Sequence, residues 1–167
     1  MDNSEIIIDK AFEAQRFDMK FKTKPLIIGG LAMEYYGLRK RGQDIDLVIT
    51  DEDYLDLSKK YPNNKKDIWG DLGVVINGFE IWRSIMLLDY NFYAEGPIEY
   101  SEYRVVSFDR LFFMRAMASA VEKYRNDFEL MKQHLLRKQR LDFIEYMNSH
   151  LEKYKAVPGG VVFNDEY

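Results

Sequence analysis

The sequence predicts an α/β protein of the α+β kind, in which a small mixed sheet with flanking helices is followed by a helical C-terminal half. A short apolar run over residues 25–28 ends at Gly29-Gly30 and is typical of a buried strand. Polar and apolar residues alternate from Asp44 to Leu47, as they do in a half-buried strand. Beyond Ser107, apolar residues recur at steps of three and four, which indicates helices.

Length and composition fit one globular domain that buries its own core. The chain has 167 residues, 47% of them hydrophobic, and no cysteine. We expect a single domain over residues 1–167, with the sheet core over about residues 1–106 and the helical part over about residues 107–157. The lack of cysteine excludes disulfides, thiolate zinc sites and cysteine nucleophiles.

The first half of the predicted sheet region contains two helices and two strands. Residues 5–17 carry apolar side chains at helical intervals, and residues 31–36 form a short predicted helix. Gly37 would close this helix, because glycine tolerates the left-handed conformation of a helix C-terminus. Residues 25–28 and 44–49 are the two predicted strands.

A helix and a hairpin follow. Thr50 is a candidate N-cap for a helix over residues 51–60. Asn77-Gly78 separates the apolar run 74–76 from residues 79–85, and this dipeptide supplies the positive φ angles of a type I′ turn. The sequence therefore predicts a two-residue hairpin here.

The C-terminal half is predicted to be helical. Ser107 is a candidate N-cap for a helix over residues 108–121, and Asn126 could open another. Residues 141–154 keep apolar side chains at helical spacing. We expect an extended tail from Pro158-Gly159-Gly160 onward.

Asp44 and Asp46 are the candidate metal ligands. Residues two apart in a strand point to the same face, so their carboxylates would lie roughly 6.6 Å apart along the backbone. Mg²⁺ takes oxygen ligands and commonly binds through one or two carboxylates together with substrate phosphates. The alternative is that the Asp-x-Asp pair caps a turn or faces water.

Gly29-Gly30 is the candidate phosphate seat. The pair lies between a predicted strand and a predicted helix, where a backbone without Cβ atoms lets phosphate oxygens approach main-chain N–H groups. An ordinary tight turn is the alternative for the glycines alone. Followed by a short helix, a basic connector and an Asp-apolar-Asp strand, they occur in the order that would bring phosphates and metal ions together.

These motifs resemble the signature of a known superfamily. The stretch from Leu26-Ile27-Ile28-Gly29-Gly30 to Asp44-Ile45-Asp46-Leu47 looks like that of the polymerase-β-type nucleotidyltransferases, particularly the small bacterial minimal, antitoxin-like and antibiotic-modifying members. The resemblance implies an α/β sheet core and bound Mg²⁺. It also implies transfer of a nucleoside monophosphate from ATP or another nucleoside triphosphate to an acceptor hydroxyl on a small molecule, a protein or an RNA end.

The resemblance also implies a third acidic ligand from a neighbouring strand. Glu80 follows the Asn77-Gly78 turn and is our candidate, with Trp82 on the same face by alternation. If the position of the acid instead falls at Trp82, the ligand is missing and catalysis would be slow or absent. A solvent-facing Glu80 is the other alternative.

Basic residues near the motif are candidates for gripping the triphosphate. Arg39 and Arg41 precede the Asp pair, and a guanidinium there could hold phosphate with paired hydrogen bonds. Lys123 and Arg125 could likewise reach phosphates from the helical half. The alternative for all four is solvated surface.

Two functional hypotheses follow. The first is a Mg²⁺-dependent nucleotidyltransferase that uses Asp44, Asp46 and Glu80. The second is a catalytically weak or inactive protein of the same fold that binds a protein partner, as an antitoxin-like module. The net charge of −4 argues against broad nucleic-acid binding. The sequence shows neither a secretory signal nor an apolar run long enough to span a membrane, so we expect a cytoplasmic protein without membrane contact.

Overall fold

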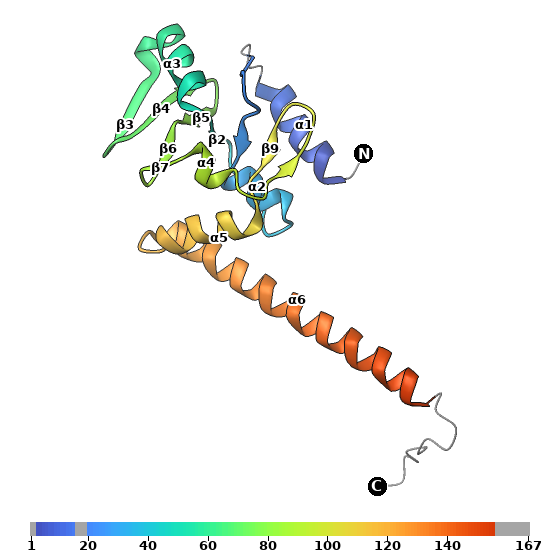
Figure 1. The fold of residues 1–167 in the computed structure, drawn as a ribbon. Coiled ribbons are helices and arrows are strands. Elements are labelled where there is room, and N and C mark those ends of the chain that lie inside the picture. The colour runs from blue at the N-terminus through green and yellow to red at the C-terminus, as the bar shows by residue number, and fades with distance from the viewer. Residues whose placement is uncertain (1–2, 16–19, 156–167) are drawn as a thin grey trace. The chain divides into compact units, whose positions relative to one another are not determined.

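The structure is a computed structural model that describes residues 3–15 and 20–155. Figure 1 shows its arrangement of helices and strands. The elements, in chain order, are α1 (Asn3–Gln15), β1 (Leu26–Ile27), α2 (Gly29–Tyr35), β2 (Ile45–Val48), α3 (Asp51–Lys60), the 3-10 turn η1 (Pro62–Asn64), β3 (Lys65–Ile68), β4 (Asp71–Ile76), β5 (Phe79–Trp82), β6 (Ser84–Ile85), β7 (Leu88–Asp89), α4 (Tyr90–Tyr93), β8 (Ile98–Glu99), β9 (Arg104–Val105), α5 (Phe108–Met117) and α6 (Glu122–Lys155).

The main sheet is mixed and has seven strands in the order β3-β4-β5-β2-β1-β9-β8. β2 runs antiparallel to β1 and parallel to β5, so the end of β1 lies beside the starts of β2 and β5. β6 and β7 form a separate two-stranded ribbon. The predicted α+β class, a mixed sheet with flanking helices and a helical C-terminal half, is confirmed.

The chain divides into two compact units, Met1–Phe128 and Glu129–Tyr167. The first unit contains the whole sheet with α1 to α5 and the first residues of α6. In the second unit, the structure describes the rest of α6, as far as Lys155. The sequence analysis had placed the change from sheet to helices near residue 107; the division between the compact units lies inside α6.

One face of the central strands carries an apolar core. Ile45, Leu47, Phe79 and Ile81 are fully buried. α1 covers this face, because the Phe12 ring lies against the Phe79 ring with centroids 5.5 Å apart. Side chains alternate along a strand, so the residues between these four point to the opposite face.

Three local predictions are confirmed at the level of hydrogen bonds. Thr50 caps α3, where its side-chain oxygen accepts from the Asp53 backbone N–H at 3.3 Å. Gly37, with φ of +67°, closes α2, while Leu38 N–H donates to the Met33 carbonyl in the two-bond pattern typical of a glycine C-terminus. Asn77 and Gly78 both have positive φ and connect β4 to β5 in antiparallel register.

Two helices differ from prediction. α2 begins at Gly29, two residues before the predicted start, so the glycines form its first turn. α6 begins at Glu122 and continues as one helix of 34 residues, where the sequence analysis expected separate helices from Asn126 and over 141–154. No proline or glycine occurs between Glu122 and Lys155, so nothing in the local sequence breaks the helix.

Several short strands were not predicted. β3 has four exposed residues, Lys65 to Ile68, without apolar alternation, and it joins the sheet through backbone pairing to β4. Lysines on such an edge strand hinder pairing with other chains. The expected tail from Pro158 lies outside the described residues, as does the end of the helix expected over residues 5–17.

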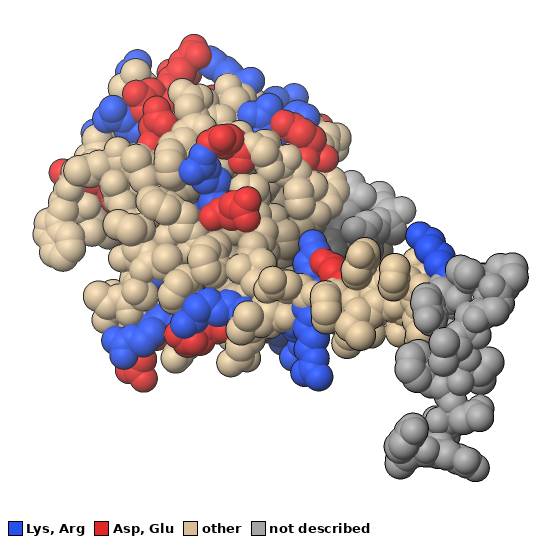
Figure 2. Space-filling view, turned by 60° about the horizontal axis from the view of Figure 1, so that its bottom comes forward, with Lys and Arg blue, Asp and Glu red and all other residues tan. Residues whose placement is uncertain are grey.

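Positively and negatively charged side chains are interspersed on the surface. Lys and Arg side chains lie next to Asp and Glu side chains over the face drawn in Figure 2, in keeping with the net charge of −4. Among the described residues, no helix combines the length and the apolar character that a membrane crossing needs.

Candidate functional site

Asp46 and Glu80 lie side by side on neighbouring strands. β2 and β5 pair in parallel with Asp46 opposite Glu80 and Val48 opposite Trp82. Neighbouring strands lie about 4.8 Å apart, and residues paired across them share a face. The register therefore places a carboxylate beside Asp46, and it assigns the other candidate position, Trp82, to a buried ring beside Val48.

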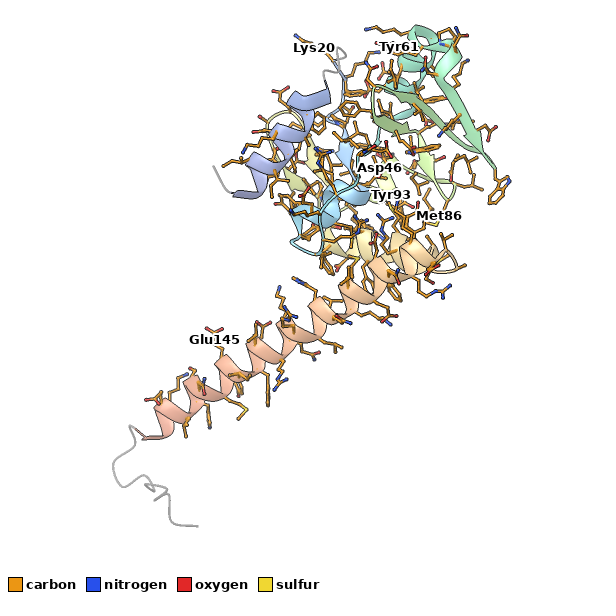
Figure 3. All side chains as sticks on the ribbon, turned by 180° about the vertical axis from the view of Figure 1, so that it is seen from behind. Lys20, Asp46, Tyr61, Met86, Tyr93 and Glu145 are labelled. Carbon is orange, nitrogen blue, oxygen red and sulfur yellow. The ribbon has the colours of Figure 1, made fainter. Side chains whose placement is uncertain are left out.

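Asp44 lies just before β2 and is exposed. Within residues 3–15 and 20–155, no three Asp, Glu, His or Cys side chains form a group that could hold a metal ion. The fold thus brings Asp46 together with Glu80, while Asp44 lies one residue before the start of β2. Figure 3 shows Asp46 among the side chains of the sheet unit.

The Asp46 carboxyl has a strongly raised pKa. Burial is the largest cause and the negative charge of Glu80 is the second; together they raise the pKa of Asp46 from 3.8 to about 6. A hydrogen bond from the Gly30 backbone N–H and the positive charges of Arg115 and Lys123 act in the opposite direction without cancelling the rise. A carboxyl group whose pKa is raised toward neutral pH, next to a second carboxyl group, is typical of functional sites.

Gly29 makes room for Asp46. Its φ is +63°, and a Cβ built on it would overlap the Asp46 carboxylate, 2.7 Å from the Asp46 Cγ. Gly30 differs, because a Cβ there would meet its nearest neighbour, the Gly42 nitrogen, at an ordinary 3.5 Å. The backbone N–H of Gly30, one of the groups expected to receive phosphate, points at the Asp46 carboxylate. The glycine pair and the Asp strand therefore form one packed unit.

A buried acid organises two arginines near Asp46. Asp127, in the first turns of α6, is 2% exposed and accepts from Arg39 Nε at 2.5 Å and from Arg39 Nη2 at 2.8 Å. Arg115, on α5, is 5% exposed and places its Nε 3.1 Å from Asp127 Oδ2, the oxygen that also accepts from Arg39 Nη2. The Arg115 guanidinium also lies over the Tyr124 ring, 4.8 Å from its centroid.

The two arginines act on Asp46 electrostatically. The hydrogen bonds that Arg39 donates to Asp127 raise the pKa of Arg39, and the charge of Asp46 adds to this effect. Burial lowers the pKa of Arg115, while Asp127 and Asp46 oppose that change. A guanidinium keeps its charge even so, because its pKa starts far above neutrality. Fixed positive charge therefore acts on the Asp46 carboxylate.

The four basic residues predicted to bind phosphate have different surroundings in the structure. Arg39 lies near Asp46 but is held by Asp127, and Lys123 acts on Asp46 through its charge. Arg41 lies 3.7 Å from Glu34, and Arg125 donates to the carbonyls of Ser119 and Ala120 after the end of α5. Lys66 Nζ lies 3.8 Å from Glu80. Arg39 and Lys123 thus interact with Asp46 through their charges, whereas Arg41 and Arg125 are held by other partners.

Sequence analysis missed Arg115. The available signal was its place on α5, four residues after the buried Leu111 and next to the buried Met114, where a charged side chain must have a partner. Its partner, Asp127, lies twelve residues further along the chain, and nothing in the local sequence indicates that the two side chains meet.

Comparisons of the chain with protein-family models, with curated proteins and with solved structures give no match.

Asp46→Asn should make the protein more stable near neutral pH. The folded-state pKa of about 6 lies above the unfolded value, so the native state binds the extra proton and stability falls as pH rises from 4 to 6. The pKa difference corresponds to at most about 3 kcal/mol, and the partial exposure of Asp46 reduces this. Urea unfolding should show a gain at pH 7.5 that vanishes near pH 4. Exposed Asp44→Asn is the control; an equal loss of stability at both pH values in Asp46→Asn would contradict the account.

The two glycines should respond differently to alanine. Gly29→Ala forces a Cβ into the Asp46 carboxylate at a positive φ, so we expect a loss of about 2–4 kcal/mol in unfolding free energy. Gly30→Ala has space, and its cost should stay within about 1 kcal/mol. Thermal and urea unfolding of both variants measure the difference; equal effects would show that Asp46 does not occupy this space.

Asp127→Asn should destabilise the fold by about 3 kcal/mol, because it leaves the buried Arg115 without a counter-charge. Asp51→Asn is the matched control: it breaks an exposed pair in which Arg83 Nε donates to Asp51 at 2.6 Å, and should cost less than about 1 kcal/mol. Urea unfolding at pH 7.5 compares them. Similar losses in the two variants would rule out a buried charge cluster.

Proposed function

We propose that this chain is a Mg²⁺-dependent nucleotidyltransferase that moves a nucleoside monophosphate from a nucleoside triphosphate to an acceptor hydroxyl. The observation that carries the proposal is the pairing of Asp46 with Glu80 on the central strands β2 and β5, next to the glycine turn where α2 begins. Two carboxylates side by side, one with a raised pKa, are the oxygen donors that a hard divalent cation takes.

Asp46 and Glu80 would hold the Mg²⁺, and Asp44 would contribute from the entrance to β2. The donor set fits, because a cation between the two acids would stabilise the buried charge of Asp46 and remove its repulsion with Glu80, the two causes that raise the pKa of Asp46. Bound Mg²⁺ would neutralise phosphate charge and help to activate the acceptor hydroxyl.

Positively charged side chains held in place would stabilise the charge that develops on the phosphate oxygens. Asp127 fixes Arg39 and positions Arg115 close enough to act on Asp46, and Lys123 adds a third cation. Arginines held in place need no rearrangement when charge develops on phosphate oxygens, which is how phosphoryl-transfer sites achieve most of their catalysis. His134 and His150 lie on α6 in the second unit and have no part in this scheme.

ATP or another nucleoside triphosphate would be the donor. The acceptor hydroxyl would belong to a small molecule, a protein or an RNA end, and the reaction would take place in the cytoplasm. Because charge is mixed on the surface of Figure 2, an acceptor would be recognised locally rather than through a broad basic face.

One observation favours the second candidate function, a protein-binding module with an antitoxin-like role. α6 exposes large apolar side chains, among them Leu136, Phe143 and Tyr146, which are 60–68% exposed. Protein binding through α6 is compatible with catalysis in the sheet unit. Loss of binding without loss of catalysis, or the reverse, would separate the two functions.

To test the enzyme, nucleoside triphosphates labelled at the α-phosphate are incubated with the protein, Mg²⁺ and candidate acceptors, and triphosphate binding is measured by calorimetry. We expect Mg²⁺-dependent binding that falls at least tenfold in Asp46→Asn and in Glu80→Gln, with loss of label transfer. Because Asp46→Asn is expected to be the more stable protein at pH 7.5, unfolding would not explain the loss.

Asp51→Asn, in an exposed ion pair outside the acidic pair, is the control and should bind as the unmodified protein does. Binding that is unaffected by both carboxylate variants, or that needs no Mg²⁺, would contradict the proposed function.

A further inference from the structure

The second unit exposes a row of apolar side chains along α6. Leu136 is 66% exposed, Phe143 60% and Met147 52%. Soluble monomers rarely leave large neighbouring apolar side chains uncovered, and such a surface marks an interaction site. A single helix also gains most of its stability from packing of its apolar face rather than from its own hydrogen bonds.

The apolar row and three polar residues that continue it have the spacing of a coiled-coil seam. Six exposed positions follow one another at alternating steps of three and four: Gln133, Leu136, Arg140, Phe143, Met147 and His150. Alternation of three and four keeps a seam on one side of a helix that winds around a second helix.

A hollow on the same seam has the form that accepts a side chain from another helix. It is lined by Leu136, Gln139, Arg140 and Phe143, which are spaced three, four and seven residues from the first. Four residues in this arrangement make the hole into which a facing helix inserts one side chain.

Charge along α6 is divided into two halves. Residues 132–140 carry four Lys or Arg and no acid, whereas residues 141–152 carry three Asp or Glu and no Lys or Arg. Figure 3 labels Glu145 in the acidic half. Two copies of this helix in parallel would set like charge against like, while antiparallel copies set each basic half against an acidic half. The pattern is therefore self-complementary in the antiparallel orientation, as a two-fold interface requires.

We propose that α6 pairs with α6 of a second copy of the chain as an antiparallel coiled coil whose midpoint lies between Leu141 and Asp142. In this register Leu136 of one copy faces Met147 of the second copy. Phe143 of the second copy fills the hollow beside Arg140 of the first, where the Arg140 guanidinium can lie over the Phe143 ring. Gln133 faces His150, a polar pair that fixes orientation as polar seam residues do. The inference is independent of nucleotidyl transfer, because its residues belong to the second unit.

The first test is the oligomeric state of the full chain, measured by light scattering and sedimentation. We expect a dimer at micromolar concentrations, and Phe143→Asp should weaken it at least tenfold without changing the circular dichroism of the fold. Exposed Leu55→Asp on α3 is the matched control and should leave the dimer intact. A monomer at every concentration would overturn the proposal, including the case in which α6 binds a different protein.

The second test fixes orientation. The chain has no cysteine, so single cysteines can be introduced without background. Gln133→Cys and His150→Cys should each fail to cross-link as a homodimer but should form a disulfide when the two variants are mixed. Efficient self-cross-linking of Gln133→Cys would show parallel helices and overturn the antiparallel pairing.

The third test addresses the charge pattern. Replacing Asp142, Glu145 and Glu152 by Lys makes both halves basic, so the dimer should weaken at least tenfold at low salt and recover partly as salt is added. An unchanged dissociation constant at low salt would contradict pairing of basic with acidic halves.

Discussion

The parallel register between β2 and β5 places Asp46 opposite Glu80 on one face of the sheet, and the rest of the site follows from this pairing. Burial is the main cause of the raised pKa of Asp46, and repulsion by the neighbouring Glu80 is the second. The missing Cβ of Gly29 leaves space for the Asp46 side chain, and the Gly30 N–H stabilises the charge of Asp46. Asp46 thus links the glycine turn at the start of α2 with the strand behind it.

A second buried acid, Asp127, holds the positively charged arginines near Asp46. Asp127 uses both oxygens to bind Arg39 and lies within ion-pair distance of Arg115, so it holds both arginines in place. Such an arrangement costs stability, because buried charges are expensive to desolvate. Proteins commonly retain unfavourable electrostatics where charge has a chemical task. An acidic pair that faces anchored arginines suits a ligand that carries both a cation and phosphate groups, as a magnesium-bound nucleotide does.

Local sequence was sufficient for features with local causes. The Thr50 cap, the Gly37 helix end and the Asn77-Gly78 turn each depend on a few neighbouring residues, and all were predicted. The position of Glu80 beside Asp46 was left open, because strand register depends on pairing between distant segments. Arg115 and Asp127 were missed as partners for the same reason: they come from α5 and α6, and only the fold shows that each compensates the other. β3 lacked a signal because its exposed residues show no apolar alternation and join the sheet through backbone pairing to β4.

The most direct test of the central claim is a crystal structure of the protein with Mg²⁺ and a non-hydrolysable nucleoside triphosphate. The account predicts an ion in contact with the carboxylates of Asp46 and Glu80, and triphosphate oxygens between that ion and the positive charges of Arg115 and Lys123. A nucleotide bound elsewhere, or an ion that leaves Asp46 and Glu80 without contact, would contradict it.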